Sequence, residues 1–148
     1  MLKLLKKRLK NEKGLTLVEV LAVVVILAIV AAIAIPAIGN IINNSEIKSA
    51  KADVANVLSA ANIYFADKGE TNGKTVGYTQ LKDYVDTWGV LDEVKESVQV
   101  TKGSPNSLSL SDNKTITVAG KTVKISGATV DNLKIDSPDP TDSFSFTK

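Results

Sequence analysis

The chain has 148 residues, of which 44% are hydrophobic and 23% charged, and this length favours one compact domain with an appendage. Residues 1–14 contain six basic residues and one acidic residue, a net charge of +5, which leaves −3 for residues 15–148. A mildly acidic body argues against direct nucleic-acid binding, which uses a basic face. The sequence has no Cys and no His, which excludes disulfides, zinc sites with Cys or His ligands, and catalysis by either residue.

The first predicted element is a membrane helix that follows the basic leader, residues 1–14. Val20 to Ile38 are 19 consecutive residues of Val, Leu, Ala and Ile, apart from Pro36. As a helix rising about 1.5 Å per residue, this run spans roughly the 30 Å hydrocarbon core of a bilayer. The positive-inside rule then places the leader in the cytoplasm and the body outside. A secretory signal peptide is the alternative, although its apolar core is shorter, at about 7 to 15 residues.

The helix is predicted to continue beyond the membrane, over 15–68, and to end at Gly69. In its second half, apolar residues recur at spacings of 3 or 4, as on one face of an amphipathic helix. These residues are Ile47, Ala50, Val54, Leu58, Ala61 and Phe65. We interpret this stripe as the surface that packs against the chain's own globular body. Pro36 and Gly39 interrupt the helical pattern, so a kink or local melting is predicted there.

The remainder predicts a small, mostly β head. Residues 69–79 contain three glycines and are predicted to form a loop, and Gln80 to Trp88 a short helix. Alternation of apolar and polar residues then predicts half-buried strands. These strands centre on Val98–Val100, Leu108–Leu110, Ile116–Val118 and Val123–Ile125. Turn signals at 104–107 and 119–121 favour an antiparallel meander. Val130 to Ile135 are predicted to add a last strand, and the polar tail 137–148 to have little regular structure.

Together these elements predict an α+β fold, in which a long N-terminal helix packs on a small antiparallel sheet. The predicted organisation follows the chain. It consists of a leader over 1–14, a membrane and polymerisation helix over 15–42, an amphipathic helix over 43–68, a head over 69–136 and a tail over 137–148.

The stretch "KGLTLVEVLAVVVILAIVAAIAIPAI" resembles the N-terminus of type IV prepilins and the related pseudopilins. That family has a basic leader ending in Gly, a cleavage after that Gly, and an apolar helix with Glu at the fifth mature position. Here Gly14 ends the leader, Leu15 becomes the new N-terminus, and Glu19 falls at position five. Pro36 falls where the family commonly has a kinking proline. The fold expected from the sequence fits the family loosely.

Two departures from the family pattern concern the first mature residue and the disulfide. Many pilins begin with Phe, whereas this chain has Leu15, which the peptidase of the family also tolerates. Many Gram-negative pilins close a C-terminal loop with a disulfide, and this chain has no Cys. The resemblance therefore suggests a Gram-positive-type pilin.

The resemblance implies a structural subunit of a type IV pilus or competence pilus. It would be cleaved after Gly14 by the prepilin peptidase, N-methylated on Leu15 by the same enzyme, and polymerised through its apolar helix. Its expected partners are this peptidase and methyltransferase, the pilus assembly platform protein, the cytoplasmic membrane, and further copies or other pilins in a helical filament. It would lie in the cytoplasmic membrane before assembly and at the cell surface afterwards. A pseudopilin of a type II secretion-like system and a signal-anchored surface protein that does not polymerise are the alternatives.

The charge of Glu19 in an apolar helix also has a physical interpretation that does not depend on the resemblance. A carboxylate at the centre of a membrane helix costs about 2.5 to 3.5 kcal/mol, so it usually has a partner. Cleavage would create an ammonium at Leu15, one helical turn away. In a bundle, Glu19 of one subunit can meet the ammonium of a neighbour, which would fix the axial register. The alternative is a carboxylate solvated at the headgroup boundary.

Other chemistry finds little support in the sequence. Asp136, Asp139 and Asp142 recur every third residue in the tail, but a calcium loop of the EF-hand type would add a Gly and a bidentate Glu. We therefore favour a solvated tail. The loop 69–79 lacks the spacing of a phosphate-binding loop. No catalytic constellation is present, so no enzyme, cofactor or metal site is expected. Four aromatic residues are predicted to anchor the core rather than to stack on a ligand: Tyr64, Phe65, Tyr84 and Trp88.

Overall fold

The computed structural model describes the backbone of residues 2–135, 137–141 and 144–146. Within these ranges it describes the side chains from residue 17 onward, except that of residue 146. The chain divides into two compact units, Met1–Ile41 and Ile42–Lys148. The first unit is helical, and the second is the head.

One helix, α1 (Leu2–Lys68), supplies the first unit and the first element of the head. The predicted start at residue 15 is wrong, because α1 begins thirteen residues earlier. The leader contains four Leu, five Lys and one Arg, which are strong helix formers, and they favour the helix despite Asn11 and Gly14. Pro36 and Gly39 lie within α1, so no melted segment interrupts it. A kink at these residues stays a prediction.

The end of α1 at Gly69 is confirmed. Gly69 has φ +60°, in the left-handed region that favours glycine. The backbone N–H of Glu70 donates to the carbonyl of Phe65 at 3.2 Å. These features make up the Schellman motif, which satisfies a free carbonyl at the end of the helix and turns the chain back into the head.

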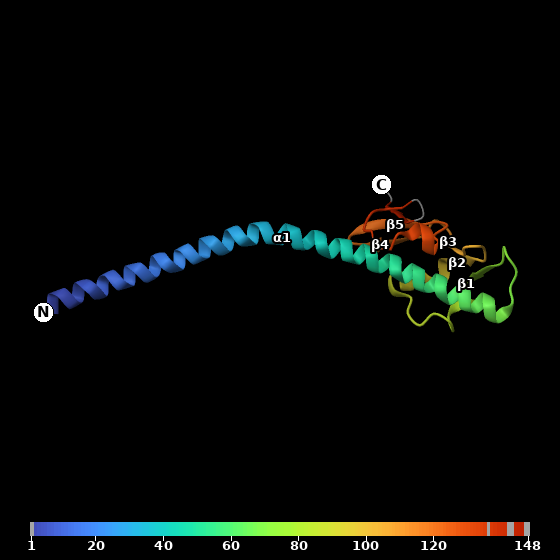
Figure 1. Cartoon of the computed structure of the whole chain (residues 1–148), viewed down its shortest axis with the longest axis horizontal. Helices are drawn as coiled ribbons and strands as arrows, with labels where there is room; N and C mark the ends of the chain where they lie inside the picture. The colour runs from blue at the N-terminus through green and yellow to red at the C-terminus, as the bar shows by residue number, and fades with distance from the viewer. Residues whose placement is uncertain (1, 136, 142–143, 147–148) are drawn as a thin grey trace. The chain divides into compact units, whose positions relative to one another are not determined.

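The predicted apolar stripe of α1 is confirmed as the packing surface of the head. All six stripe residues are buried, and Val54, Leu58 and Ala61 are fully so. Figure 1 follows this part of α1, from teal to green, alongside the strands of the head. The core that it forms with the rest of the head includes Leu81, Leu91, Val98, Val100, Leu108, Ile125, Leu133 and Phe144. Burial of this apolar surface is the main force holding the head together.

The strands form two antiparallel three-stranded sheets rather than the single meander predicted. The first sheet has the order β1 (Thr75–Gly77), β2 (Val98–Thr101), β3 (Ser107–Leu110), and the second has the order β4 (Thr115–Val118), β5 (Lys121–Ile125), β6 (Phe144–Phe146). The four strands predicted from alternation are all present. The meander breaks after β3, where Asp112 and Asn113 both have positive φ. Leu108 instead pairs with Ala128, across an isolated bridge.

The segment before β2 differs from the prediction. Within the predicted loop 69–79, residues 75–77 form β1, which pairs with β2. The predicted helix over 80–88 is only one turn, α2 (Tyr78–Leu81), and a 3₁₀ helix, η1 (Gly89–Ser97), follows. A carboxylate oxygen of Asp53 accepts a hydrogen bond from the N–H of Val90 at 3.0 Å, which satisfies a free donor at the start of η1.

The C-terminal predictions also need correction. Residues 130–135 do not form a strand. One helical turn, α3 (Val130–Leu133), begins there with a capping box, in which Thr129 and Asn132 exchange side-chain to backbone hydrogen bonds. The tail contains β6, which pairs with β5, and Phe144 of β6 is fully buried. The residues next to Phe144 in sequence are polar, so the sequence contains no indication that its aromatic ring would be buried in the core.

Candidate functional site

The sequence-predicted processing residues lie on successive turns of α1. Gly14 and Leu15 are within the helical backbone, and Glu19 follows Leu15 by four residues, or about one turn. The side chain of Glu19 is exposed. The structure therefore places this carboxylate on the surface of an apolar helix, one turn from the backbone nitrogen that cleavage would free.

The apolar run of α1 exposes its large side chains in the part of the chain that the structure describes. Its large hydrophobic side chains, from Leu17 to Ile42, are 50–71% exposed. Among the described residues, one helix is long and apolar enough to cross a membrane, with a mean hydropathy of 3.1 in its most apolar stretch. Exposed apolar surface costs about 25 cal/mol per Å² in water, so this run needs a bilayer or other protein surfaces around it.

The family model of the prokaryotic N-terminal methylation motif matches residues 9–35, a segment that includes Gly14, Leu15 and Glu19. The chain carries the prepilin-type methylation motif. This motif is that of the type IV pilin and pseudopilin family, whose members are structural proteins and not enzymes. Searches of the curated proteins and of the solved structures gave no match.

The prepilin motif indicates how the chain is processed and where its apolar helix lies before assembly. It implies that prepilin peptidase processes the chain, and together with the exposed apolar run it indicates membrane anchoring before assembly. The head agrees with this reading in its architecture, because a long helix packs against small antiparallel sheets. The system in which the subunit works is not specified by the motif.

A buried lysine in the head is a feature that sequence reasoning missed. The side chain of Lys51 is fully buried, and its Nζ donates to the carbonyl oxygens of Ser137 at 2.9 Å and Asp139 at 2.6 Å. A third carbonyl, of Lys134, lies at 3.5 Å. Burial lowers the pKa of Lys51, and the negative charge of Asp139 opposes this shift. The hydrogen bonds of Lys51 therefore hold the segment before β6 against α1.

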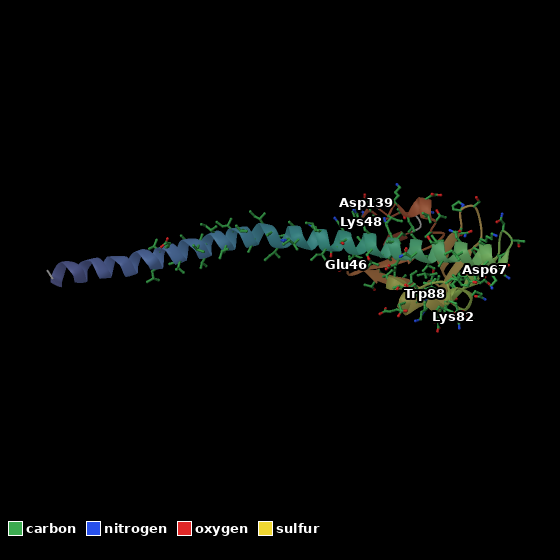
Figure 2. The ribbon with its side chains drawn as sticks, turned by 60° about the horizontal axis from the view of Figure 1, so that its bottom comes forward. Glu46, Lys48, Asp67, Lys82, Trp88 and Asp139 are labelled. Atoms are coloured by element: carbon green, nitrogen blue, oxygen red, sulfur yellow. The ribbon has the colours of Figure 1, made fainter. Side chains whose placement is uncertain are left out.

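This contact bears on the calcium site considered from sequence. Asp136 and Asp142 lie outside the described residues, so only Asp139 can be placed. Figure 2 labels Asp139 on the C-terminal segment. Its backbone carbonyl is bound by the Lys51 ammonium, and one of its carboxylate oxygens accepts a hydrogen bond from Ser137 at 3.2 Å. The Lys51 ammonium thus occupies the cluster formed by the backbone carbonyl oxygens of Lys134, Ser137 and Asp139. Over the described residues, no group of three acidic side chains is placed to hold a metal ion.

The aromatic residues of the head act mainly in packing. Phe65 and Trp88 are buried, which confirms the prediction for these two. Tyr64 and Tyr84 are half-buried and pack edge to face, with ring centroids 5.3 Å apart. The Tyr84 hydroxyl donates to the Asp67 carboxylate at 2.6 Å. This hydrogen bond, with a smaller contribution from Lys68, lowers the pKa of Asp67.

Proposed function

We propose that the protein is a structural subunit of a type IV pilus or competence pilus. In this proposal it is cleaved after Gly14, N-methylated on Leu15, and polymerised through α1 into a helical filament. The observation that carries the proposal is the prepilin motif at residues 9–35, which includes most of an apolar run whose large hydrophobic side chains are exposed. Identical apolar helices can cover one another once they leave the bilayer.

Glu19 would set the register of the filament. After cleavage, the Leu15 ammonium of one copy and the Glu19 carboxylate of a neighbour would meet within an apolar bundle. An unpaired charge there is costly, so only the register that pairs the two charges is favourable. The contact joins different surfaces of the two copies and does not close, and it therefore propagates as a helix. The assembly platform protein would supply subunits from the cytoplasmic membrane.

Mass spectrometry of the N-terminus tests the processing step. The subunit is purified from its native membrane and from sheared surface material, and its N-terminal peptide is sequenced. We expect a chain that begins at Leu15 and carries one added methyl group. A Gly14→Val variant provides the control and should keep its leader. An intact Met1 in the wild-type chain would contradict the proposal.

Electron microscopy of the sheared material separates the filament types. Long surface filaments that contain the processed chain support a pilus. Short filaments that remain in the envelope favour a pseudopilin of a type II secretion-like system. Processed protein that stays unassembled in the membrane favours an anchored surface protein.

A further inference from the structure

Asp139 is followed by Pro140, and this is the one Asp-Pro peptide bond in the sequence. The side chain of an aspartate can react with the adjacent backbone by two intramolecular routes. In one route, the N–H of the next residue attacks the side-chain carboxyl group. Proline has no N–H, so this route is closed at Pro140. The route that remains is attack by the Asp139 carboxylate on the carbonyl carbon of its own peptide bond.

The structure holds the carbonyl oxygen of this peptide bond against a buried cation. Lys51 Nζ donates to the carbonyl oxygen of Asp139 at 2.6 Å. Because the Lys51 side chain is fully buried, water screens this contact little. An ammonium in this position draws electrons from the carbonyl group and stabilises negative charge that develops on its oxygen. It therefore has the position and the charge of an oxyanion-hole donor.

The carboxylate of Asp139 is oriented by hydrogen bonds and is open to water. One of its oxygens accepts from the Ser137 hydroxyl at 3.2 Å, and that hydroxyl oxygen accepts from the backbone N–H of Asp139 at 3.1 Å. Asp139, labelled in Figure 2, and Pro140 are both exposed. A nucleophile, a polarised carbonyl group and access for water thus meet at one peptide bond.

We propose that the Asp139–Pro140 bond is a self-cleavage site, at which the Asp139 carboxylate is the nucleophile and the Lys51 ammonium stabilises the oxyanion. Carboxylates serve as nucleophiles in other enzymes and proteins that form covalent intermediates. The proposal is independent of filament formation and adds a chemical modification of the head to the proposed function.

The reaction consumes one water molecule and needs no other reactant. A carboxylate oxygen of Asp139 bonds to the carbonyl carbon of the same residue, and the carbonyl electrons move to the oxygen that Lys51 holds. The C–N bond to Pro140 then breaks, and the proline nitrogen takes the electron pair and a proton from the solvent. This step leaves a cyclic anhydride at Asp139. Water opens the anhydride, so Asp139 becomes a C-terminal residue with two carboxyl groups.

The product is favoured at both new ends of the chain. The new α-carboxylate of Asp139 lies against the Lys51 ammonium, and a charged acceptor binds an ammonium more strongly than a neutral carbonyl does. Residues 140–148 are then held only by non-covalent contacts, which include the pairing of β6 with β5 and the buried ring of Phe144. A strand of three residues pairs weakly. We therefore expect the freed segment to leave and to uncover the edge of β5.

Mass spectrometry of the full chain in detergent measures the cleavage. The chain is held at about pH 4, where carboxylates are partly ionised and the solvent supplies protons. We expect the peptide 140–148 to accumulate about 100-fold faster from the folded chain than from the same chain unfolded in guanidinium chloride, because one oxyanion donor contributes about this factor. The unfolded chain reports the intrinsic lability of an Asp-Pro bond. Equal rates, or faster cleavage of the unfolded chain, overturn the proposal.

Substitutions separate the two roles. Asp139→Ala removes the nucleophile and should abolish cleavage at this bond. Lys51→Met removes the oxyanion donor and should slow cleavage of the folded chain about 100-fold. Lys48→Met is the matched control, since it changes an exposed lysine of the same helix, and it should cleave at the wild-type rate. A folded Asp139→Ala chain that still releases the peptide overturns the role of the carboxylate.

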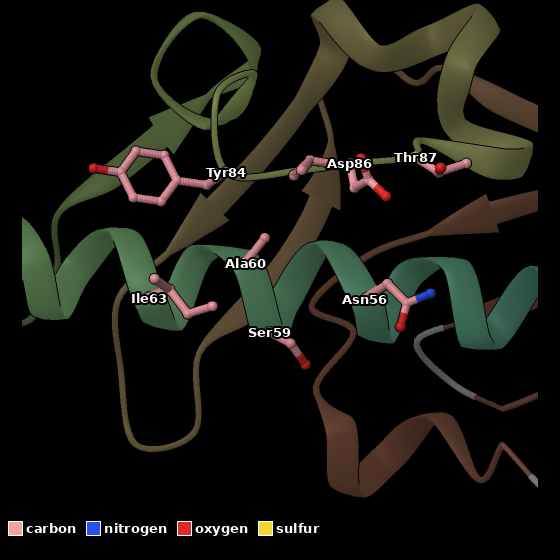
Figure 3. Close-up of a pocket in the computed structure, with 8 residues that line it drawn as sticks. Asn56, Ser59, Ala60, Ile63, Tyr84, Asp86 and Thr87 are labelled. Carbon is pink, nitrogen blue, oxygen red and sulfur yellow. The ribbon is translucent and has the colours of Figure 1, made fainter.

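A second control accounts for lost stability, because Lys51→Met also weakens the head. Tyr84→Phe weakens it elsewhere, through loss of the hydrogen bond to Asp67. Figure 3 shows Tyr84 at a groove that it lines together with Ile63 of α1, and neither Lys51 nor Asp139 is among the lining residues. Tyr84→Phe should therefore cleave at the wild-type rate.

Circular dichroism at the same pH shows which chains are folded. A folded Lys51→Met chain that cleaves as fast as wild type overturns the proposal. If Lys51→Met does not fold, the comparison of folded and unfolded wild-type chains decides the outcome. No filaments are needed for these measurements, so their failure would leave the proposed function intact.

Discussion

Two charged residues of α1 illustrate how the head uses ionic side chains to satisfy backbone groups. Lys51 donates to carbonyls of the C-terminal segment, and Asp53 accepts from Val90 at the start of η1. The hydrogen bond between Asp53 and Val90 requires a glycine at position 89. Gly89 has φ +53°, and a Cβ there would lie 2.2 Å from the Asp53 carboxylate. Loss of either ionic partner leaves polar backbone groups unsatisfied, which costs about 1 to 3 kcal/mol per buried group.

The hydrogen bond from Tyr84 to Asp67 predicts a pH-dependent contribution to stability. Figure 2 places Asp67 near the end of α1. Because this bond lowers the Asp67 pKa from its ordinary value of 3.8, its contribution is complete above pH 3.8 and is lost as the pH falls through the lower, folded-state pKa. A Tyr84→Phe variant should therefore have a higher Asp67 pKa. It should be less stable than wild type at neutral pH, by a margin that shrinks in acid.

Carboxyl NMR of the full chain in detergent measures the Asp67 pKa, and denaturant unfolding at several pH values measures the stability margin. Tyr64→Phe is the matched control, because Tyr64 packs on Tyr84 and its hydroxyl is not the one bonded to Asp67. That control should leave the Asp67 pKa unchanged. An Asp67 pKa that is the same in wild type and Tyr84→Phe would refute the assignment of this hydrogen bond as the main cause.

At the scale of elements, β6 depends on a contact that lies outside its own sheet. β6 is an edge strand of three residues, paired only with β5 among the described strands. Three residues form a weak strand by themselves. Phe144 is buried in the core, and the Lys51 ammonium lies 5.8 Å from its ring centroid while it holds the preceding segment. We therefore expect Lys51 to control the local stability of β6.

A Lys51→Met variant keeps most of the side-chain volume and removes the donors to Ser137 and Asp139. We expect a loss of about 2 to 3 kcal/mol in unfolding free energy, because buried carbonyls lose a charged partner. Hydrogen exchange should show faster exchange in β5 and β6, while β2 and β3 keep their protection. Lys48→Met is the control, since Lys48 is an exposed lysine on the same helix. Unchanged protection of β6 in Lys51→Met would show that the ammonium does not hold this strand.

The elements that sequence predicted well are those defined by local patterns. The amphipathic stripe of α1, its glycine stop, and the four strands with alternating residues all depend on neighbours within a few positions. The elements that it missed depend on distant partners. β1 exists because it pairs with β2, and β6 because it pairs with β5, at sequence separations of 19 to 26 residues. A window of sequence around Thr75 or Phe144 contains no sign of that partner.

The same distinction applies to the candidate site. The processing residues were predicted because Gly14, Leu15, Glu19 and the apolar run lie in one continuous stretch with fixed spacing. Lys51 was missed because its partners are 83 to 88 residues away. One local signal was available, since Lys51 lies between Ala50 and Val54 of the buried stripe. A lysine beside a buried stripe can extend along the helix to an outer partner, however, so its burial does not follow from position alone.

At the scale of the molecule, the proposed function would place one helix of the mature chain in two different surroundings. In the bilayer the apolar run is covered by lipid, and in a filament it would be covered by other copies. In the proposed filament, Glu19 would be unfavourable in the apolar bundle unless it had a cationic partner. The cleaved N-terminus is the nearest such partner in the chain. Under the proposed function this requirement would link processing to assembly, because an uncleaved chain has no ammonium at Leu15.

The link predicts that Glu19→Ala blocks assembly after normal processing. The variant keeps the apolar run and the cleavage site, so we expect a mature, methylated chain in the membrane. Filament yield should fall at least about tenfold, because the Leu15 ammonium enters the bundle without a partner and no register is preferred. Glu12→Ala is the matched control, since it removes a carboxylate that cleavage discards. Sheared filaments are quantified by immunoblot and electron microscopy, and the mature N-terminus by mass spectrometry. If Glu19→Ala chains assemble at the wild-type yield, the carboxylate does not set the register, and apolar packing alone must specify how the copies align.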